Sequence, residues 1–225
     1  MSSENLVIIP EENLTETCFP ITFEQVLIPR TKENEARYRH LTVLILGVYV
    51  NEGHKIMVIN KNPKNRVRYP EKSFPEICRD IPGGHCIYSA IPEDELQSGK
   101  ISEETVRSQA FKEFSEEVVF TKDQKVAFRE RDFKFVGFYP YDGPDNRELS
   151  ALFTLAIPFY DGELQTQDNV GDVICSLPNE AISYQQLSDE WQNRHENKEA
   201  LRFEDGLGRL MMKGDLLKQI EKVQL

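Results

Sequence analysis

The segment Ala110–Phe120 reads AFKEFSEEVVF, and its acidic residues decide how the rest of the chain is interpreted. Glu113 precedes Glu116 by three positions and Glu117 by four, and in an α-helix these spacings place side chains on one face. Three like charges on one face repel each other, so the arrangement gives an isolated helix no advantage. A hard divalent cation such as Mg²⁺ requires oxygen ligands that converge on one point. The segment therefore predicts a metal-binding helix.

The residues upstream of this segment predict how the helix begins. A glycine pair ending at Gly84 follows the apolar segment 80–82, and Ser102 has the side chain of a helix N-cap residue. We therefore expect a strand-like segment, a Gly-Gly turn and a helix over Glu104–Val118. A competing interpretation is a solvated acidic helix that only packs its apolar side, since charge runs often mean no more than that. The inward-facing residues would be Val106, Ala110, Phe114 and Val118.

These residues together resemble the Nudix box. That box reads glycine, five residues, glutamate, seven residues, arginine-glutamate, an apolar residue, any residue, two glutamates, any residue, glycine and an apolar residue. Lys112 stands in place of the arginine, Val119 replaces the second glycine, and residues 85–103 fill the gap of five. A lysine offers a single point charge where arginine presents a planar fork. The matching positions are Gly84, Glu104, Glu113, Phe114, Glu116, Glu117 and Phe120.

The resemblance implies a fold, a reaction and a set of residue roles. The fold would be an α/β/α sandwich around a mixed β-sheet, which the order of predicted strands and helices also favours. The reaction would be hydrolysis of a pyrophosphate bond in a nucleoside diphosphate linked to another group, with Mg²⁺ or Mn²⁺ as cofactor. The metal ligands would be Glu113, Glu116, Glu117 and the backbone near Gly84, and the catalytic candidates are Glu116, Glu104, Lys112 and Glu148.

The general base has more than one candidate. Glu116 lies in the box, whereas Asp145 and Glu148 lie in a later segment, 141–148, that is dense in turn-forming residues. For Asp145 we favour turn formation beside Pro144. For Glu148 an exposed loop charge and a catalytic base fit the sequence equally well, and only geometry separates them.

Two other functional classes fit parts of the pattern. The departures at Lys112 and Val119 and the long insertion favour a non-catalytic Nudix-fold protein that binds a ligand or regulates. An isomerase of the kind known in the same superfamily for isopentenyl diphosphate is a weaker alternative. Cys86 follows His85 directly, but no matching cysteine motif surrounds it. For His85 itself, local hydrogen bonds in a turn are favoured over contact with a phosphate or ordering of the insertion.

Charge indicates the class of partner. The 225 residues carry a net charge of −11, which argues against nucleic-acid binding, because contacts to a phosphate backbone need a basic face. A small phosphoanhydride substrate remains compatible, since bound metal ions reverse the local sign of an acidic site. The segment 61–79 is locally basic. Its basic side chains either bind substrate phosphates or belong to an exposed loop that keeps the protein soluble. The phosphate-contact candidates are Arg66, Arg68 and Arg79.

Cysteine spacing and hydropathy indicate the compartment. The four cysteines show no CxxC spacing, so neither a zinc site nor a disulfide framework is suggested. We see no signal peptide and no apolar run of the length of a membrane span. The expectation is a cytoplasmic protein that does not associate with membranes, and a homodimer is compatible with it.

Patterning outside the box predicts the remaining organisation. We expect an N-terminal extension over 1–39, a Nudix-like domain over 40–180 and a helical segment over 181–225 packed on the same domain. Within these limits we expect a hairpin of Leu41–Val50 with Lys55–Asn60, strands at Phe133–Tyr139 and Leu149–Ile157, and helices at Tyr184–His195 and Leu207–Val223.

Overall fold

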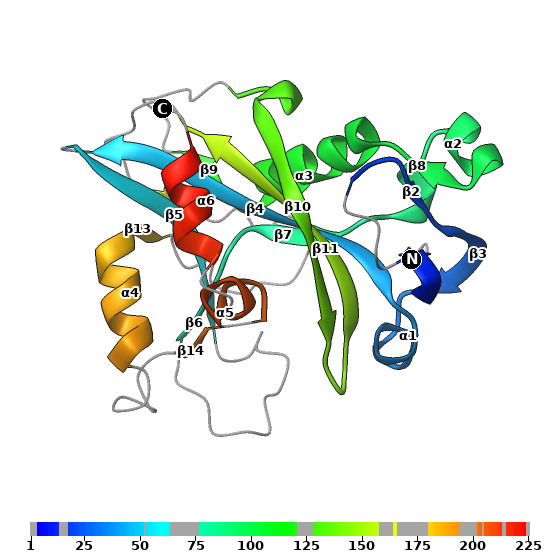
Figure 1. Cartoon of the computed structure of the whole chain (residues 1–225), viewed down its shortest axis with the longest axis horizontal. Coiled ribbons are helices and arrows are strands. Elements are labelled where there is room, and N and C mark those ends of the chain that lie inside the picture. The colour runs from blue at the N-terminus through cyan, green and yellow to red at the C-terminus, as the bar shows by residue number, and fades with distance from the viewer. Residues whose placement is uncertain are drawn as a thin grey trace. The chain divides into compact units, whose positions relative to one another are not determined.

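A computed structural model of the chain shows a mixed α/β fold with a largely antiparallel sheet and several helices (Figure 1), consistent with the predicted α/β/α sandwich. Among the described residues, no helix combines the length and apolar character needed to cross a membrane. The chain divides into two compact units, formed by residues 1–45, 83–113 and 133–153 and by residues 46–82, 114–132 and 154–225. The structure describes residues 4–13, 18–51, 53–63, 77–120, 128–157, 164–165, 180–193, 202–203, 205–212 and 215–223.

The sheet of the first unit brings together strands that are far apart in the sequence. Strand β1 pairs antiparallel with β3 and meets the start of β4, where Ile8 lies opposite His40. Strand β7 also runs antiparallel to β4, and β11 lies between β10 and β4. The bounds of these strands are Asn5–Ile8 for β1, Glu24–Pro29 for β3, His40–Asn51 for β4, Gly83–His85 for β7, Phe133–Asp142 for β10 and Arg147–Ala156 for β11.

The observed strands differ from the sequence-based expectations at two places. The expected Gly-Gly turn is the strand β7, in which Gly84 lies opposite Val43 and His85 opposite Thr42. The loop expected over 141–148 is shorter, because β10 continues to Asp142 and β11 begins at Arg147. Backbone hydrogen bonds of the ladder override the turn propensity of these residues. A turn closed by the Gly143 amide, which donates to the Asn146 carbonyl at 2.9 Å, joins the two strands.

Helix α3, Glu103–Glu117, confirms the predicted box helix. The Thr105 amide donates to the Ser102 hydroxyl at 3.2 Å, so Ser102 caps the first turn as expected. The apolar residues predicted to face inward are all buried. After the helix the chain enters the short strand β9, Val119–Phe120, and a β-branched residue suits a strand better than a helix end.

The inserted residues form structure of their own. They include a 3-10 turn at Tyr88–Ala90, helix α2 at Glu93–Ser98 and strand β8 at Lys100–Ile101. Gly99 ends α2 with a φ of 67°, a left-handed conformation that favours glycine. Strand β8 pairs with β2, Ile21–Thr22, and buries Ile101 against Ile21. The sequence of the insertion predicts a loop or short helix with little apolar material. The short helix is present, but Ile91 is also buried, so the expectation of little apolar material was wrong.

The residues before β4 are built into the first unit. Besides β1, β2 and β3 they include a 3-10 turn, Glu11–Asn13, and helix α1, Lys32–Arg37, which Thr31 caps. Leu6, Val7 and Ile8 are almost fully buried. The domain limits at 39/40 and 180/181 stay a prediction.

The second unit contains the predicted hairpin. Strand β4 turns into β5, His54–Pro63, with Asn51 opposite His54, which confirms the expected pairing. Strand β5 also pairs antiparallel with β6, Ile77–Asp80, and with β13, Glu180–Ser183. Strand β14, Arg202–Phe203, pairs parallel with β6. A two-stranded sheet pairs β12, Leu164–Gln165, with β9.

Helices complete the second unit. Helix α4, Tyr184–Asn193, confirms the expected helix, but the single helix expected over Leu207–Val223 is two helices, α5 and α6. Their bounds are Asp205–Met212 and Asp215–Lys222, and a glycine of low helix propensity, Gly214, lies between them in the sequence.

Candidate functional site

The box carboxylates lie along one continuous helix. Glu113, Glu116 and Glu117 are half-buried residues in the last turns of α3. Lys112 and Glu104 are exposed on the same helix. The helix thus presents its carboxylates at the spacings of three and four residues that the sequence analysis relied on.

Gly84 and Glu113 of the predicted site lie against each other. A Cβ atom built on Gly84 would lie 2.2 Å from Oε2 of Glu113 and 2.5 Å from its Cδ, far inside van der Waals contact. The carboxylate therefore occupies the space that any other residue at position 84 would fill. A glycine at this position lets a carboxylate oxygen reach the backbone of β7.

Cys86 also lies on the Glu113 side of β7. The thiol is almost fully buried, and burial raises its pKa, while the negative charge of Glu113 raises it further. The thiol therefore stays protonated and is neither a thiolate nucleophile nor a ready metal ligand. Among the described side chains, Cys18 and Cys86 are free thiols.

His85 extends from the other face of β7. Successive side chains of a strand point to opposite faces, so Gly84 and Cys86 share one face and His85 belongs to the other. The register places His85 opposite Thr42, and His40 lies two residues before Thr42 on the same face of β4. The expectation of a turn histidine was therefore wrong, because His85 is a paired strand residue.

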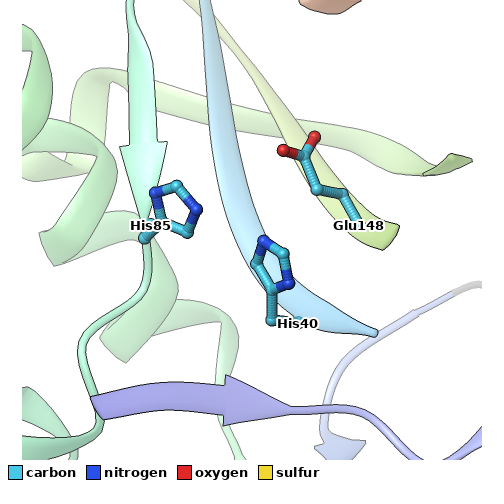
Figure 2. Close-up of side chains that lie close together, drawn as sticks. All are labelled: His40, His85 and Glu148. Atoms are coloured by element: carbon cyan, nitrogen blue, oxygen red, sulfur yellow. The ribbon is translucent and has the colours of Figure 1, made fainter. Parts of the chain in front are cut away.

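His40, His85 and Glu148, which we call the histidine cluster, come together on this face. Their ligand atoms lie within 4.8 Å of one another, and Figure 2 shows the side chains approaching from β4, β7 and β11. The two imidazole rings are stacked, with centroids 4.9 Å apart and planes inclined by 16°. His40 is fully buried and Glu148 is 7% exposed. Glu148 is therefore a buried strand residue and not an exposed loop charge.

Arg39 fixes the hairpin that carries Glu148. Its guanidinium donates to the Glu148 carbonyl at 3.1 Å, to the Tyr141 carbonyl at 3.2 Å and to the Asp142 carboxylate at 2.5 Å. The Arg39 side chain is 1% exposed, and its bond to the Glu148 carbonyl is buried, where a hydrogen bond is stronger. Its hydrogen bond lowers the pKa of Asp142, and Arg147 contributes to the same shift.

The other predicted residues are the phosphate-contact arginines and Asp145. Arg66 and Arg68 lie outside the described residues, and Arg79 is a residue of β6. Asp145 is exposed in the turn between β10 and β11, as the turn interpretation expected. Among the aromatics near that turn, Phe138 packs against Phe19 and Phe135 at centroid distances of 4.9 Å.

His40 was missed by the sequence analysis. It stands alone at the start of a strand, and no spacing links it to His85 or Glu148. The available signal was alternation, because His40 and Thr42 place polar side chains on one face of an otherwise apolar strand. Such a pattern indicates a polar cluster inside the sheet but does not name its other members.

No protein-family model matches the chain, and no curated protein matches it. Solved structures are similar to it, and three of them illustrate the likeness. The NUDIX domain of Shewanella oneidensis NrtR complexed with ADP ribose has 9% identity and a TM-score of 0.46 over 81% of this chain and 88% of that one. The T. brucei MERS1–RNA complex has 11% identity and a TM-score of 0.45 over 80% and 62%.

The third similar structure is a MutT/nudix family protein from Enterococcus faecalis, with 10% identity and a TM-score of 0.35 over 89% of this chain and 78% of that one. Two of the three are thus Nudix structures, the family that the box spacing resembles. All three TM-scores are below 0.5, so these likenesses give no information on activity or ligand.

Proposed function

We propose that the chain is a metal-dependent hydrolase that cleaves a pyrophosphate bond in a nucleoside diphosphate linked to another group. The observation that supports this best is the contact of Glu113 with β7 at Gly84, where a Cβ atom would overlap the carboxylate. A solvated acidic helix needs no such contact. A metal site that combines box glutamates with a backbone carbonyl near Gly84 does.

The donor set suits Mg²⁺ or Mn²⁺. Glu113, Glu116 and Glu117 supply carboxylate oxygens from one helix, and hard divalent cations prefer oxygen ligands. The bound metal would offset the charge of the substrate phosphates and lower the pKa of a bound water. The carboxylates hold the metal and orient it toward the phosphoanhydride.

The other residues of the box have supporting roles in this proposal. Glu116 is the general base, since it lies in the box and Glu148 belongs to the histidine cluster. Lys112 holds a neighbouring carboxylate as a point charge, and Glu104 supports the start of the helix. The phosphate contacts are assigned to Arg66, Arg68 and Arg79. The substrate is a small molecule, and the free thiols fit a cytoplasmic protein.

The test is a comparison of two glutamine variants of α3. Metal-free protein is assayed with Mg²⁺ and with Mn²⁺ against nucleoside diphosphate sugars, dinucleoside polyphosphates, ADP-ribose, nucleoside triphosphates and coenzyme A derivatives, with release of monophosphate or pyrophosphate as the readout. We expect Glu117→Gln to lose turnover by at least about 100-fold, because a metal ligand contributes several kcal/mol. Glu103→Gln, which weakens a partly buried pair with Arg107, is expected to keep its turnover.

Each outcome of this assay has a meaning. Metal-dependent release that disappears in Glu117→Gln establishes the hydrolase and its substrate class. Equal turnover in both variants shows that the metal assignment is wrong. No turnover with any substrate, together with a ligand-induced rise in melting temperature, supports the non-catalytic binding protein instead.

A further inference from the structure

We propose that the histidine cluster is a second metal site, selective for Zn²⁺, and independent of the box. Its two imidazoles and one carboxylate form a donor set that zinc takes up in proteins and that leaves a fourth position for water. The proposal rests on the geometry of the first unit alone and holds whether or not the chain is a hydrolase.

The three side chains already approach the separation that zinc requires. Their ligand atoms lie within 4.8 Å of one another. A tetrahedral Zn²⁺ with bonds of about 2.0–2.1 Å holds its ligand atoms about 3.3 Å apart. Zinc binding therefore requires side-chain rotations that draw the atoms together by about 1.5 Å and turn the stacked imidazole rings until their in-plane lone pairs converge on the ion. Three different strands contribute, so a bound ion would tie β4, β7 and β11 together.

Each imidazole has an outer partner that orients it. Nδ1 of His40 lies 3.1 Å from the Tyr38 carbonyl, so it carries the proton and donates, which leaves Nε2 to bind metal. Nε2 of His85 lies 3.4 Å from Oε1 of Glu35, within ion-pair distance although the two atoms form no hydrogen bond. Such outer partners fix the tautomer of metal-binding histidines.

The outer partners are themselves held in place. Glu35 accepts a hydrogen bond from Nε of Arg30 at 3.0 Å. The side-chain amide of Asn146 donates to Oε1 of Glu148 and orients the carboxylate. Glu35 and Asn146 are both buried, so the supports of two of the three ligands are shielded from water.

Hydrogen bonds beside the histidine cluster link two of its strands, β4 and β11. Beside the cluster, the hydroxyls of Thr42 and Ser150 are 2.8 Å apart and link β4 to β11 across the same face. Arg39 anchors the β10–β11 hairpin, which carries Glu148. The side chain of His85 is 14% exposed, which gives an ion a route to otherwise buried ligands.

The box cannot provide the same site. Glu113 lies on the Gly84 face of β7, whereas His85 belongs to the opposite face. The box donors are oxygens, and nitrogen ligands favour zinc over Mg²⁺. Zinc bound at the histidine cluster is therefore expected to resist competition by millimolar Mg²⁺.

Zinc titration of the full-length chain tests the proposal. The protein is stripped with a chelator, and the probe is Zn²⁺ alone, followed by calorimetry and by competition with a chromophoric chelator in excess Mg²⁺. Glu148→Gln keeps the shape of the side chain, and His85→Ala removes a half-buried ring, so both variants are expected to fold. We expect each to weaken zinc binding by about 100-fold or more, and Glu35→Gln to weaken it about tenfold.

Glu33→Gln is the matched control, because it makes the same chemical change on the exposed side of α1. The site is supported if one equivalent of zinc binds in the presence of Mg²⁺ and if the affinity falls in Glu148→Gln, His85→Ala and Glu35→Gln. The affinity of Glu33→Gln should equal that of wild type. Wild-type protein that binds no zinc under these conditions overturns it. So does zinc binding that is equal in wild type, Glu148→Gln and His85→Ala. Far-ultraviolet circular dichroism of each variant separates loss of a ligand from loss of the fold.

Discussion

Gly84 and His85 are neighbours in β7, yet they belong to two different chemical environments. On the Gly84 face a carboxylate of α3 closes on the strand, and the donors are oxygens. On the His85 face two imidazoles and a carboxylate gather from three strands. The alternation of a single strand therefore separates the proposed Mg²⁺ site from the proposed Zn²⁺ site. Neighbouring residues in a sequence need not share a function.

The sharpest way to break this comparison is to disable each face in turn. We expect Glu113→Gln to lower metal-dependent hydrolysis by at least about 100-fold while zinc affinity stays the same. His85→Ala should show the reverse, with weaker zinc binding and hydrolysis close to wild type. Parallel assays of turnover and zinc titration check both. If either variant loses both properties while its circular dichroism is native, the two faces form one site.

A smaller effect is expected from a methyl group at the point of contact. Gly84→Ala would displace the Glu113 carboxylate, which is the movable end of a side chain, and should lower kcat by about 10-fold to 100-fold with little change in melting temperature. Gly137→Ala in β10 is the control, because its nearest new neighbour is Tyr139 at 4.0 Å. Unchanged kinetics in Gly84→Ala would show that the contact has no part in hydrolysis.

The exchange of one cation for another on α3 should act only on the box. Lys112→Arg is expected to preserve kcat or raise it a few-fold, because a guanidinium holds a carboxylate more rigidly than an ammonium group does. Lys32→Arg, on the exposed surface of α1, makes the same substitution away from both faces. A fall in kcat that is confined to Lys112→Arg would argue that the position needs the compact lysine charge.

The smallest effect concerns the hairpin that carries Glu148. The hydrogen bond from Arg39 lowers the pKa of Asp142 in the folded state. Asp142 therefore stabilises the fold above the unfolded pKa of about 3.9, and this contribution disappears as pH falls through the lower folded pKa. Between pH 7 and pH 3 the free energy of unfolding, measured in urea, should fall less in Asp142→Asn than in wild type. Because Asp142 is 59% exposed, the difference is small, and equal losses would contradict the assignment.

The sequence was sufficient where the signal was local. Helix α3 was predicted because its N-cap residue, most of its buried face and its carboxylates all lie within the sixteen residues Ser102–Glu117. The β4–β5 hairpin was predicted for the same reason, since a turn signal separates two aliphatic runs. In both cases the residues that determine the element lie in one continuous segment of the chain.

The histidine cluster lay beyond such reasoning. His40, His85 and Glu148 are separated by 45 and 63 positions, and they meet only because β7 and β11 both lie beside β4. The strand order is set by long-range pairing, which composition and periodicity do not reveal. Glu148 was considered, but as a loop residue, because turn-forming residues around Pro144 obscured the start of β11.

The pairing of β2 with β8 determines where the chain can be cut. A fragment that begins at His40 would match the start of the predicted Nudix-like domain, but it would separate Ile101 from Ile21 and strip the partner strand from β8. Bare strand edges and newly exposed aliphatic side chains promote aggregation. A recombinant protein intended to carry only the predicted Nudix-like domain therefore needs residues 4–39 on the same polypeptide.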